Sequence, residues 1–176
     1  MSRSCLAVGV FVLLRSAPLI ADGPQHPQVR GLDAWARESI ARGLTASPLV
    51  QELVRRLEAS DLIVHVESRD ALPRGVGGMT RFISLSGGVR YARVTLDRTL
   101  YPDVRAATLA HELQHAWELA SSGASTRHEV AALYQQIGFR ISGKQPLFYE
   151  TQAAERAGTK AWEELRGYPG PHRNGQ

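Results

Sequence analysis

One stretch of the chain, from Asp103 to Ala120, restricts the possible folds more than any other. At helical spacing it carries a first apolar face made of Ala106, Ala110, Leu113, Trp117 and Ala120. A second face combines two histidines with apolar or small residues, namely Val104, Thr108, His111, His115 and Leu119. A helix that is apolar on two sides is buried, because each apolar face packs against another element. The sequence therefore predicts a central helix that is covered on both sides.

The composition is that of one packed domain around such a helix. The chain has 176 residues, of which 43% are hydrophobic and 22% charged, which is typical of a single globular domain and not of a disordered or fibrous chain. The only cysteine, Cys5, excludes an intrachain disulfide and a cysteine metal site. The net charge is only +4, so we expect no nucleic acid partner. We also expect a monomer.

The first 21 residues have the outline of a secretory signal peptide. Arg3 provides a positive start, an apolar run covers residues 5–14 and is followed by Arg15, and a small-residue stretch ends at Ala21. The apolar run is too short for a stable membrane span, so we expect cleavage at Ala21 and export to the periplasm or secretion. The sequence further predicts a linker over residues 22–28, one domain over residues 29–166 and a disordered tail over residues 167–176.

Further helices and strands are predicted on either side of the central helix. Helical spacing is present over residues 32–42, 47–59, 126–137 and 147–165. Ser47 is the predicted N-cap of the second of these helices, because Pro48 follows it at the first helical position. The pattern of strands is present over residues 61–68, 79–86 and 89–97, and Gly87-Gly88 joins the last two as a hairpin. Together they predict an α+β fold with a short antiparallel sheet before the central helix and further helices after it.

The central helix contains the sequence His111-Glu112-Leu113-Gln114-His115, an H-E-x-x-H pattern. Residues four apart on a helix lie on the same face, one turn apart, so the imidazoles of His111 and His115 can bind one Zn²⁺. Glu112 lies about 100° around the helix, where its carboxylate can reach a metal-bound water without being a ligand. This spacing predicts one zinc ion per chain and Glu112 as the general base.

A zinc site of this kind needs a third protein ligand and an open position for water. The short form with three histidine ligands is excluded, because Glu118 and Ser121 occupy the positions of its glycine and histidine. His128 is a possible ligand, but it opens a polar stretch typical of a solvated helix start. In the last predicted helix, Glu150 falls on the core-facing stripe, where a carboxylate is costly unless it is paired or binds a cation. Glu155 points away from that stripe, so we expect Glu150 to complete the site.

Two segments give the chain a family resemblance. Residues 108–118, with the sequence T-L-A-H-E-L-Q-H-A-W-E, and residues 148–154, with the sequence F-Y-E-T-Q-A-A, resemble zincin metallopeptidases of the gluzincin type, in particular small bacterial proteins with H-E-L-Q-H. The resemblance covers most of residues 46–165. It implies a zincin-like scaffold on which the two histidines of the motif and Glu150 hold zinc and Glu112 is the base.

The chain departs from the gluzincin pattern at one position. In well-studied members an Asp four residues after the ligand glutamate orients a zinc histidine, whereas this chain has Ala154 there. Such partners fix the tautomer and the direction of the ligand. Glu118 lies on the ligand side of its helix, where it is either a substitute for that Asp or an ordinary exposed glutamate.

These observations predict a zinc-dependent metallopeptidase that cleaves a peptide or protein substrate through a metal-activated water. The resemblance implies that the extended substrate binds along a sheet edge, over either residues 79–86 or residues 89–96. An oxyanion donor is also needed, and its candidates are Tyr149, Tyr134, Tyr101, His65 and Arg81. Three alternatives stay open: a zincin-like metal-binding module without catalysis, a metal amidase that acts on a cell-wall substrate, and a metal-free helical domain.

Overall fold

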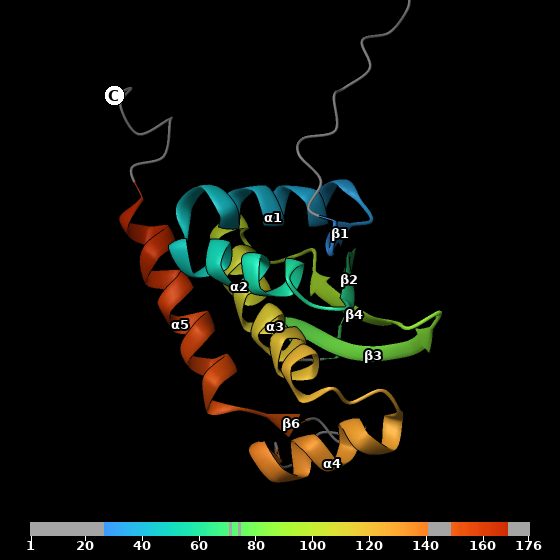
Figure 1. The fold of residues 1–176 in the computed structure, drawn as a ribbon. Helices are drawn as coiled ribbons and strands as arrows, with labels where there is room; N and C mark the ends of the chain where they lie inside the picture. Colours follow the sequence, from blue (N-terminus) through green and yellow to red (C-terminus); the bar gives the residue numbers. More distant parts are fainter. Residues whose placement is uncertain (1–26, 71, 74, 141–148, 169–176) are drawn as a thin grey trace, which may run out of the picture.

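The computed structural model describes residues 27–70, 72–73, 75–140 and 149–168. Its helices are α1 (Ala34–Ala46), α2 (Pro48–Glu58), α3 (Pro102–Ser122), α4 (Arg127–Ile137) and α5 (Gln152–Gly167) (Figure 1). Its strands are β1 (Val29–Gly31), β2 (Leu62–Arg69), β3 (Gly78–Ser86), β4 (Val89–Asp97), β5 (Phe139–Arg140) and β6 (Tyr149–Glu150). The predicted signal peptide, most of the predicted linker and residues 169–176 of the predicted tail lie outside the described residues.

The main sheet is mixed, which corrects the prediction of an antiparallel sheet. Its strand order is β1-β2-β4-β3, in which β1 pairs parallel to β2, β2 pairs parallel to β4, and only β3 and β4 are antiparallel. The sequence does not reveal β1, because three residues are too few to show the alternation of a strand. With β1 present, α1 and α2 form the crossover that returns the chain as a parallel strand. The α+β class is confirmed, and so is the β3–β4 hairpin, whose Gly87 and Gly88 have φ angles of 58° and 78°.

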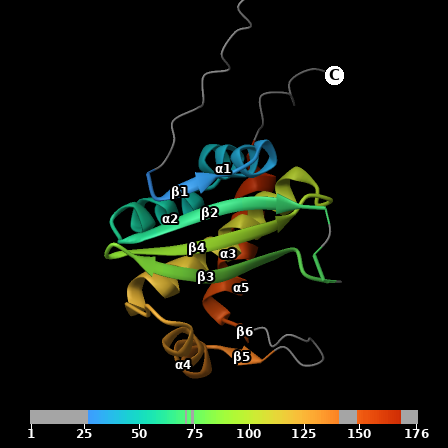
Figure 2. The same cartoon turned by 90° about the vertical axis from the view of Figure 1, so that its right-hand side faces the viewer.

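The core lies between the sheet and the helices. Alternate residues of the inner strands are fully buried, and they pack with residues of α1, α2 and α3 in one cluster. Figure 2, turned by 90° from Figure 1, views the sheet from the face that the helices do not cover, with α2 and α3 behind it. The remaining alternate positions of β2, β3 and β4 therefore face the side of the sheet that these helices do not cover.

α3 is the central helix that the sequence predicts. It packs against the sheet on one side and against α5 on the other (Figure 1). The contacting stripe of α5 consists of small residues and one leucine, Ala154, Ala157, Ala161 and Leu165, all of them buried. Gly158 lies beside that stripe, where a Cβ atom would come within 3.3 Å of the His111 Cβ atom. Small side chains therefore let α5 approach the face of α3 that carries the histidines.

Two buried arginines hold α3 at its ends. Near the beginning, the Arg105 guanidinium donates to the Ser39 hydroxyl at 2.8 Å and to the Glu38 carboxylate at 2.9 Å, both on α1. At the other end, Arg90 of β4 donates to the Asp61 carboxylate at 2.8 Å. Arg90 also donates to three carbonyl groups at the end of the helix and just beyond it, those of Leu119, Ala120 and Ala124. These bonds satisfy carbonyl groups that a helix end leaves without partners, and they fix α3 against the sheet.

Within the described residues, no helix is both long and apolar enough to cross a membrane.

Candidate metal centre

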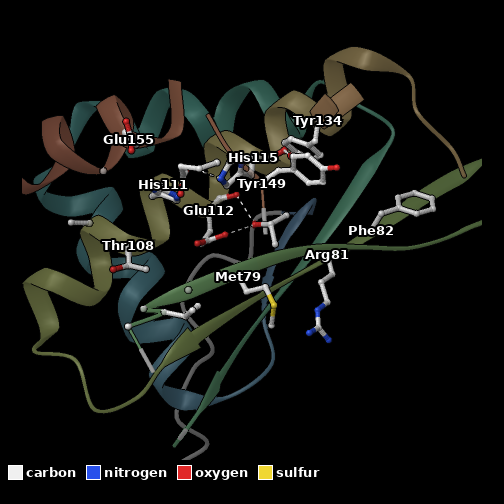
Figure 3. Close-up of a pocket in the computed structure, with 18 of the residues that line it drawn as sticks. Met79, Arg81, Phe82, Thr108, His111, Glu112, His115, Tyr134, Tyr149 and Glu155 are labelled. Atoms are coloured by element: carbon white, nitrogen blue, oxygen red, sulfur yellow. Dashed lines mark hydrogen bonds and ion pairs between the residues drawn. The ribbon is translucent and has the colours of Figure 1, made fainter. Parts of the chain in front are cut away.

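The two histidines of α3 converge on one carboxylate oxygen. The Nε2 atoms of His111 and His115 each lie 3.2 Å from Oε1 of Glu150, and the three ligand atoms lie within 4.8 Å of one another. This group lies close enough together to bind a metal ion. Figure 3 shows both histidines and Glu112 on α3, facing the space over β3. The structure therefore brings together the three residues that the sequence analysis predicts as ligands.

Glu150 reaches this position from a different local structure than predicted. The sequence places it inside a helix over residues 147–165, whereas it lies in β6, paired with Phe139 of β5, and α5 begins only at Gln152. Thr151 is the reason for the later start, because its hydroxyl accepts a hydrogen bond from the Ala154 amide as the N-cap of α5. The periodic stripe of α5 is real, but its extension back to Glu150 is wrong.

The two other candidate ligands lie outside the group. His128 is exposed in the first turn of α4, and Glu155 is exposed in the first turn of α5. Neither residue belongs to the cluster of possible metal ligands among the described residues. Glu155 nevertheless lines the same cleft as the histidines.

Glu118 lies where it can orient a histidine of the motif, the role that an Asp has in the gluzincin pattern at the position of Ala154. Its side chain is only 9% exposed, which excludes the interpretation as an ordinary surface glutamate. Nδ1 of His115 lies 2.9 Å from Oε2 of Glu118, and the Thr151 hydroxyl donates to Oε1 of Glu118 at 2.7 Å. The Thr151 amide in turn donates to Oε1 of Glu150 at 2.9 Å. One chain of hydrogen bonds therefore joins a histidine of α3 to the start of α5.

The pKa values of His115 and Glu150 show that their surroundings favour positive charge between them. Burial opposes a charged imidazole at His115, but hydrogen bonds to Glu118 and Glu150 outweigh it and raise the pKa of His115 to about 10. Burial likewise opposes the charged form of Glu150, yet hydrogen bonds from His111 and His115 hold the pKa of Glu150 well below its usual range. Glu150 therefore places an ionised carboxylate beside the Nε2 atoms of both histidines, an arrangement that favours a bound cation.

Glu112 is held apart from the three possible ligands. It is 4% exposed, and its Oε2 atom accepts a hydrogen bond from the Thr80 hydroxyl of β3 at 2.7 Å. Gly78 lies next to it on β3, where a Cβ atom would come within 2.8 Å of the Glu112 carboxylate. Burial is the main reason why the pKa of Glu112 is raised, although the two histidines and Thr80 act in the opposite direction. Sequence reasoning missed Thr80 and Gly78, because only the tertiary fold brings β3 against α3.

A cleft follows β3 past this group. Its volume of about 1260 Å³ exceeds the roughly 300–1,000 Å³ typical of small-molecule sites. Its lining includes apolar and aromatic side chains from several elements, namely Phe82, Val104, Ala107, Val130, Tyr134, Tyr149 and Trp162. β3 is an edge strand and β4 an inner one. The cleft therefore runs along residues 79–86, one of the two stretches that the sequence offers as the substrate-binding edge.

Of the five candidate oxyanion donors, three line the cleft and two do not. Tyr149, Tyr134 and Arg81 line the cleft, and Figure 3 shows both tyrosine rings beside His115. The Tyr134 hydroxyl already donates to the His115 carbonyl oxygen at 3.2 Å. Tyr101 is 81% exposed, and His65 lies on β2 beside Tyr91, and neither residue lines the cleft.

Comparisons of the chain with models of protein families, with curated proteins and with solved structures gave no match. The functional interpretation therefore depends on the residues and geometry of this site.

Proposed function

We propose that this protein is a zinc-dependent metallopeptidase. The observation that carries the proposal is the convergence of two imidazole nitrogens and one carboxylate oxygen within 4.8 Å, next to a buried glutamate and in the wall of a cleft along an edge strand. Two histidines and one glutamate are a ligand set of catalytic zinc sites, and three protein ligands leave a fourth position open. Export of the chain is part of the proposal, because of the pattern of its first 21 residues.

The donor set fits zinc better than a hard cation. Mg²⁺ and Ca²⁺ prefer ligand sets made of oxygen atoms, whereas two of the three donor atoms here are imidazole nitrogens. The Glu118 carboxylate occupies Nδ1 of His115, which leaves Nε2 of the ring as the metal ligand. When bound, zinc would supply a Lewis acid that polarises the substrate carbonyl and lowers the pKa of water.

Glu112 is the residue to which the proposal assigns proton transfer. Attack of water on an amide requires a base for the water's proton and a proton for the leaving nitrogen. The raised pKa of Glu112 suits a carboxylate that accepts a proton and then returns it. Thr80 holds the carboxylate in place through its hydrogen bond to Oε2. Glu112 therefore accepts the proton of the attacking water and delivers it to the leaving amine.

The substrate binds as an extended strand beside β3, because the outer edge of β3 borders the cleft and an edge strand pairs with an added chain through its main-chain groups. We assign the stabilisation of the oxyanion to Tyr149, because it lines the cleft directly before Glu150, whereas the Tyr134 hydroxyl already donates to a backbone carbonyl. Tyr134 itself positions the His115 backbone.

A metal-binding module without catalysis is the main competing function. In the sequence, Ala154 favours that alternative, because the residue that orients a zinc histidine is missing there. The hydrogen bond of Glu118 to His115 supplies an orienting carboxylate from another element, so this observation no longer favours an inactive protein.

The test compares the zinc-loaded protein with its Glu112→Gln variant. Both proteins should hold one zinc ion by mass spectrometry, because Glu112 is not a ligand. Cleavage of an unstructured protein and of a peptide library should fall by about 10²–10⁴-fold in the variant, the usual contribution of a general base. A wild-type protein that holds zinc and cleaves none of these substrates would contradict the peptidase. Release of cell-wall crosslinks from muropeptides instead would assign an amidase.

A further inference from the structure

Four basic residues form one row across the uncovered face of the sheet. The register pairs Arg30 of β1 with His65 of β2, His65 with Arg93 of β4, and Arg93 with Arg81 of β3. Directly paired residues on neighbouring strands share a face. The residues on either side of this row, such as Val64 and Val66 on β2, are fully buried against the helices. The row therefore lies on the face that the helices do not cover.

Like charges directly opposite each other on adjacent strands destabilise a sheet. Their effect is visible at His65, where burial and then the charges of Arg30 and Arg93 lower the pKa of the imidazole. Glu67 compensates part of the row, since its carboxylate lies 3.7 Å from Arg93. Arg81 is exposed and forms no hydrogen bond or ion pair with any residue that the structure describes. Both ends of the row lie on edge strands, and neither Arg30 of β1 nor Arg81 of β3 forms an ion pair with a described residue. Only Arg81 lines the cleft.

Arg81 is also the end of the row that borders the cleft, and Figure 3 shows it on β3 beside Met79 and Phe82. A chain that pairs with β3 becomes the next strand of the sheet, and one of its residues lies directly opposite Arg81, on the same face. The preceding residue of β3, Thr80, contacts Glu112. The substrate residue opposite Arg81 therefore lies within about one residue of the part of the substrate nearest the base.

We propose that Arg81 selects substrates with an acidic side chain at the residue that pairs with it, next to the scissile bond. An aspartate or glutamate there pairs its negative charge with the positive charge of Arg81 on the neighbouring strand. Arg127, at the start of α4, lines the same cleft and adds a second positive charge. The inference rests on the proposed peptidase function and names the substrate class of that site.

The experiment uses charge reversal on both sides. A peptide that the zinc-loaded protein cleaves is first used to map the scissile bond. It is then resynthesised with Asp, Asn or Lys at one position at a time, over the two residues before the bond and the two residues after it. Pairs of these peptides compete in one reaction, and mass spectrometry gives the ratio of their kcat/KM values. At one position Asp should be preferred over Asn by about two- to fivefold, the scale of a cross-strand charge pair, and Lys should be disfavoured.

Arg81→Glu should reverse the order at that position alone, so that Lys becomes preferred over Asp, and Arg81→Gln should remove the preference. Lys160→Glu is the matched control, because it makes the same charge change at an exposed residue of α5 that does not line the cleft. It should leave the wild-type order unchanged. Because Arg81 is exposed, these variants should fold, which their melting temperatures check.

The outcomes separate the two proposals. If the wild-type protein cleaves no peptide, the peptidase function itself is wrong, and this inference is wrong with it. Cleavage without a charge preference, or with a preference that Arg81→Glu does not change, overturns only the inference. Binding of a single-stranded oligonucleotide that Arg81→Glu abolishes, with an unchanged peptide preference, would assign the row to nucleic acid and would also overturn it.

Discussion

The two halves of the candidate metal centre are built in different ways. On α3, the two histidines, Glu112 and Glu118 lie between positions 111 and 118, so a single helix sets their spacing. Glu150 and Thr151 come from the junction of β6 and α5, and they meet α3 only because the tertiary fold brings them there. A motif on one helix therefore describes only half of such a site. The other half depends on the position at which β6 ends and α5 begins.

The supports of the two halves differ as well. α3 is held at its ends by two buried arginines, Arg105 and Arg90. β6 has two residues and pairs only with the two residues of β5 among the described strands. Its side chains connect to α3 through the bonds of Glu150 and Thr151. If both halves hold the metal, variants in either should lose it. If α3 suffices, variants at the junction should keep it.

The largest effect is expected for His115→Ala on α3. The variant removes a ligand and leaves Glu118 without its imidazole partner, so bound zinc and peptide cleavage should both be lost. Because a ligand that binds only the folded state stabilises it, zinc should raise the melting temperature of the wild-type protein and not that of the variant. His128→Ala is the control, since His128 is exposed on α4, and it should behave like the wild type.

A comparable loss is expected for Glu150→Ala at the junction. Zinc affinity should fall by orders of magnitude, because two imidazoles alone leave an incomplete site, and the stabilisation by zinc should decrease with it. Glu155→Ala removes an exposed carboxylate five residues later and should change neither quantity. Equilibrium dialysis and thermal unfolding measure both effects. A variant at Glu150 that retains full affinity would show that α3 holds the metal without β6.

A smaller effect is expected for Glu118→Gln, which changes the connection between the two halves. Glutamine keeps a hydrogen bond with Thr151 but loses the negative charge beside Nδ1 of His115. Loss of such orienting partners typically costs about 10–100-fold in metal affinity. Competition with a chromophoric chelator measures this range. An affinity equal to that of the wild type would mean that Glu118 only packs beneath the site.

The smallest effect is expected for Asp61→Asn, which touches the support of α3 and no residue of the centre. Hydrogen bonds from Arg90 are the main reason why the pKa of Asp61 is lowered, against the opposing effect of burial. A lowered folded-state pKa gives stability that is present above the ordinary value of about 3.9 and is lost as the pH falls through the folded-state value.

The wild-type protein should therefore be more stable than Asp61→Asn at pH 7, and the two should converge in strong acid. The difference should stay below about 1 kcal/mol, because the Asp61 side chain is 50% exposed. Urea unfolding at several pH values measures it. A difference that is the same at all pH values would contradict this origin.

The sequence predicts the α3 half well for a physical reason. Residues that repeat at helical spacing share a face whatever lies around them, so the histidines and Glu112 could be placed on one helix in advance. Ser47 is also predictable from the local sequence, because Pro48 follows it at the first helical position. In the structure its hydroxyl accepts a hydrogen bond from the Val50 amide as the N-cap of α2.

The junction half was predicted only in part. Extending the α5 stripe back to Glu150 carries the helix one turn too far, and Thr151, a preferred N-cap residue, is the signal for the later start. The partnership of Glu118 with Thr151 joins residues 33 positions apart, and no local pattern encodes it. The short strand β1 was missed for a related reason, since its three residues become a strand only by pairing with β2.

Zinc K-edge X-ray absorption of the zinc-loaded protein tests most directly whether α3 and β6 together form a zinc site. We predict two imidazole nitrogens at about 2.0–2.1 Å and oxygen ligands at about 2.0–2.2 Å, with no sulfur. In Glu150→Ala, any zinc that remains should keep the two imidazoles and lose the carboxylate oxygen. A protein that retains no zinc after gel filtration, or a zinc ion surrounded by oxygen atoms alone, would contradict the account.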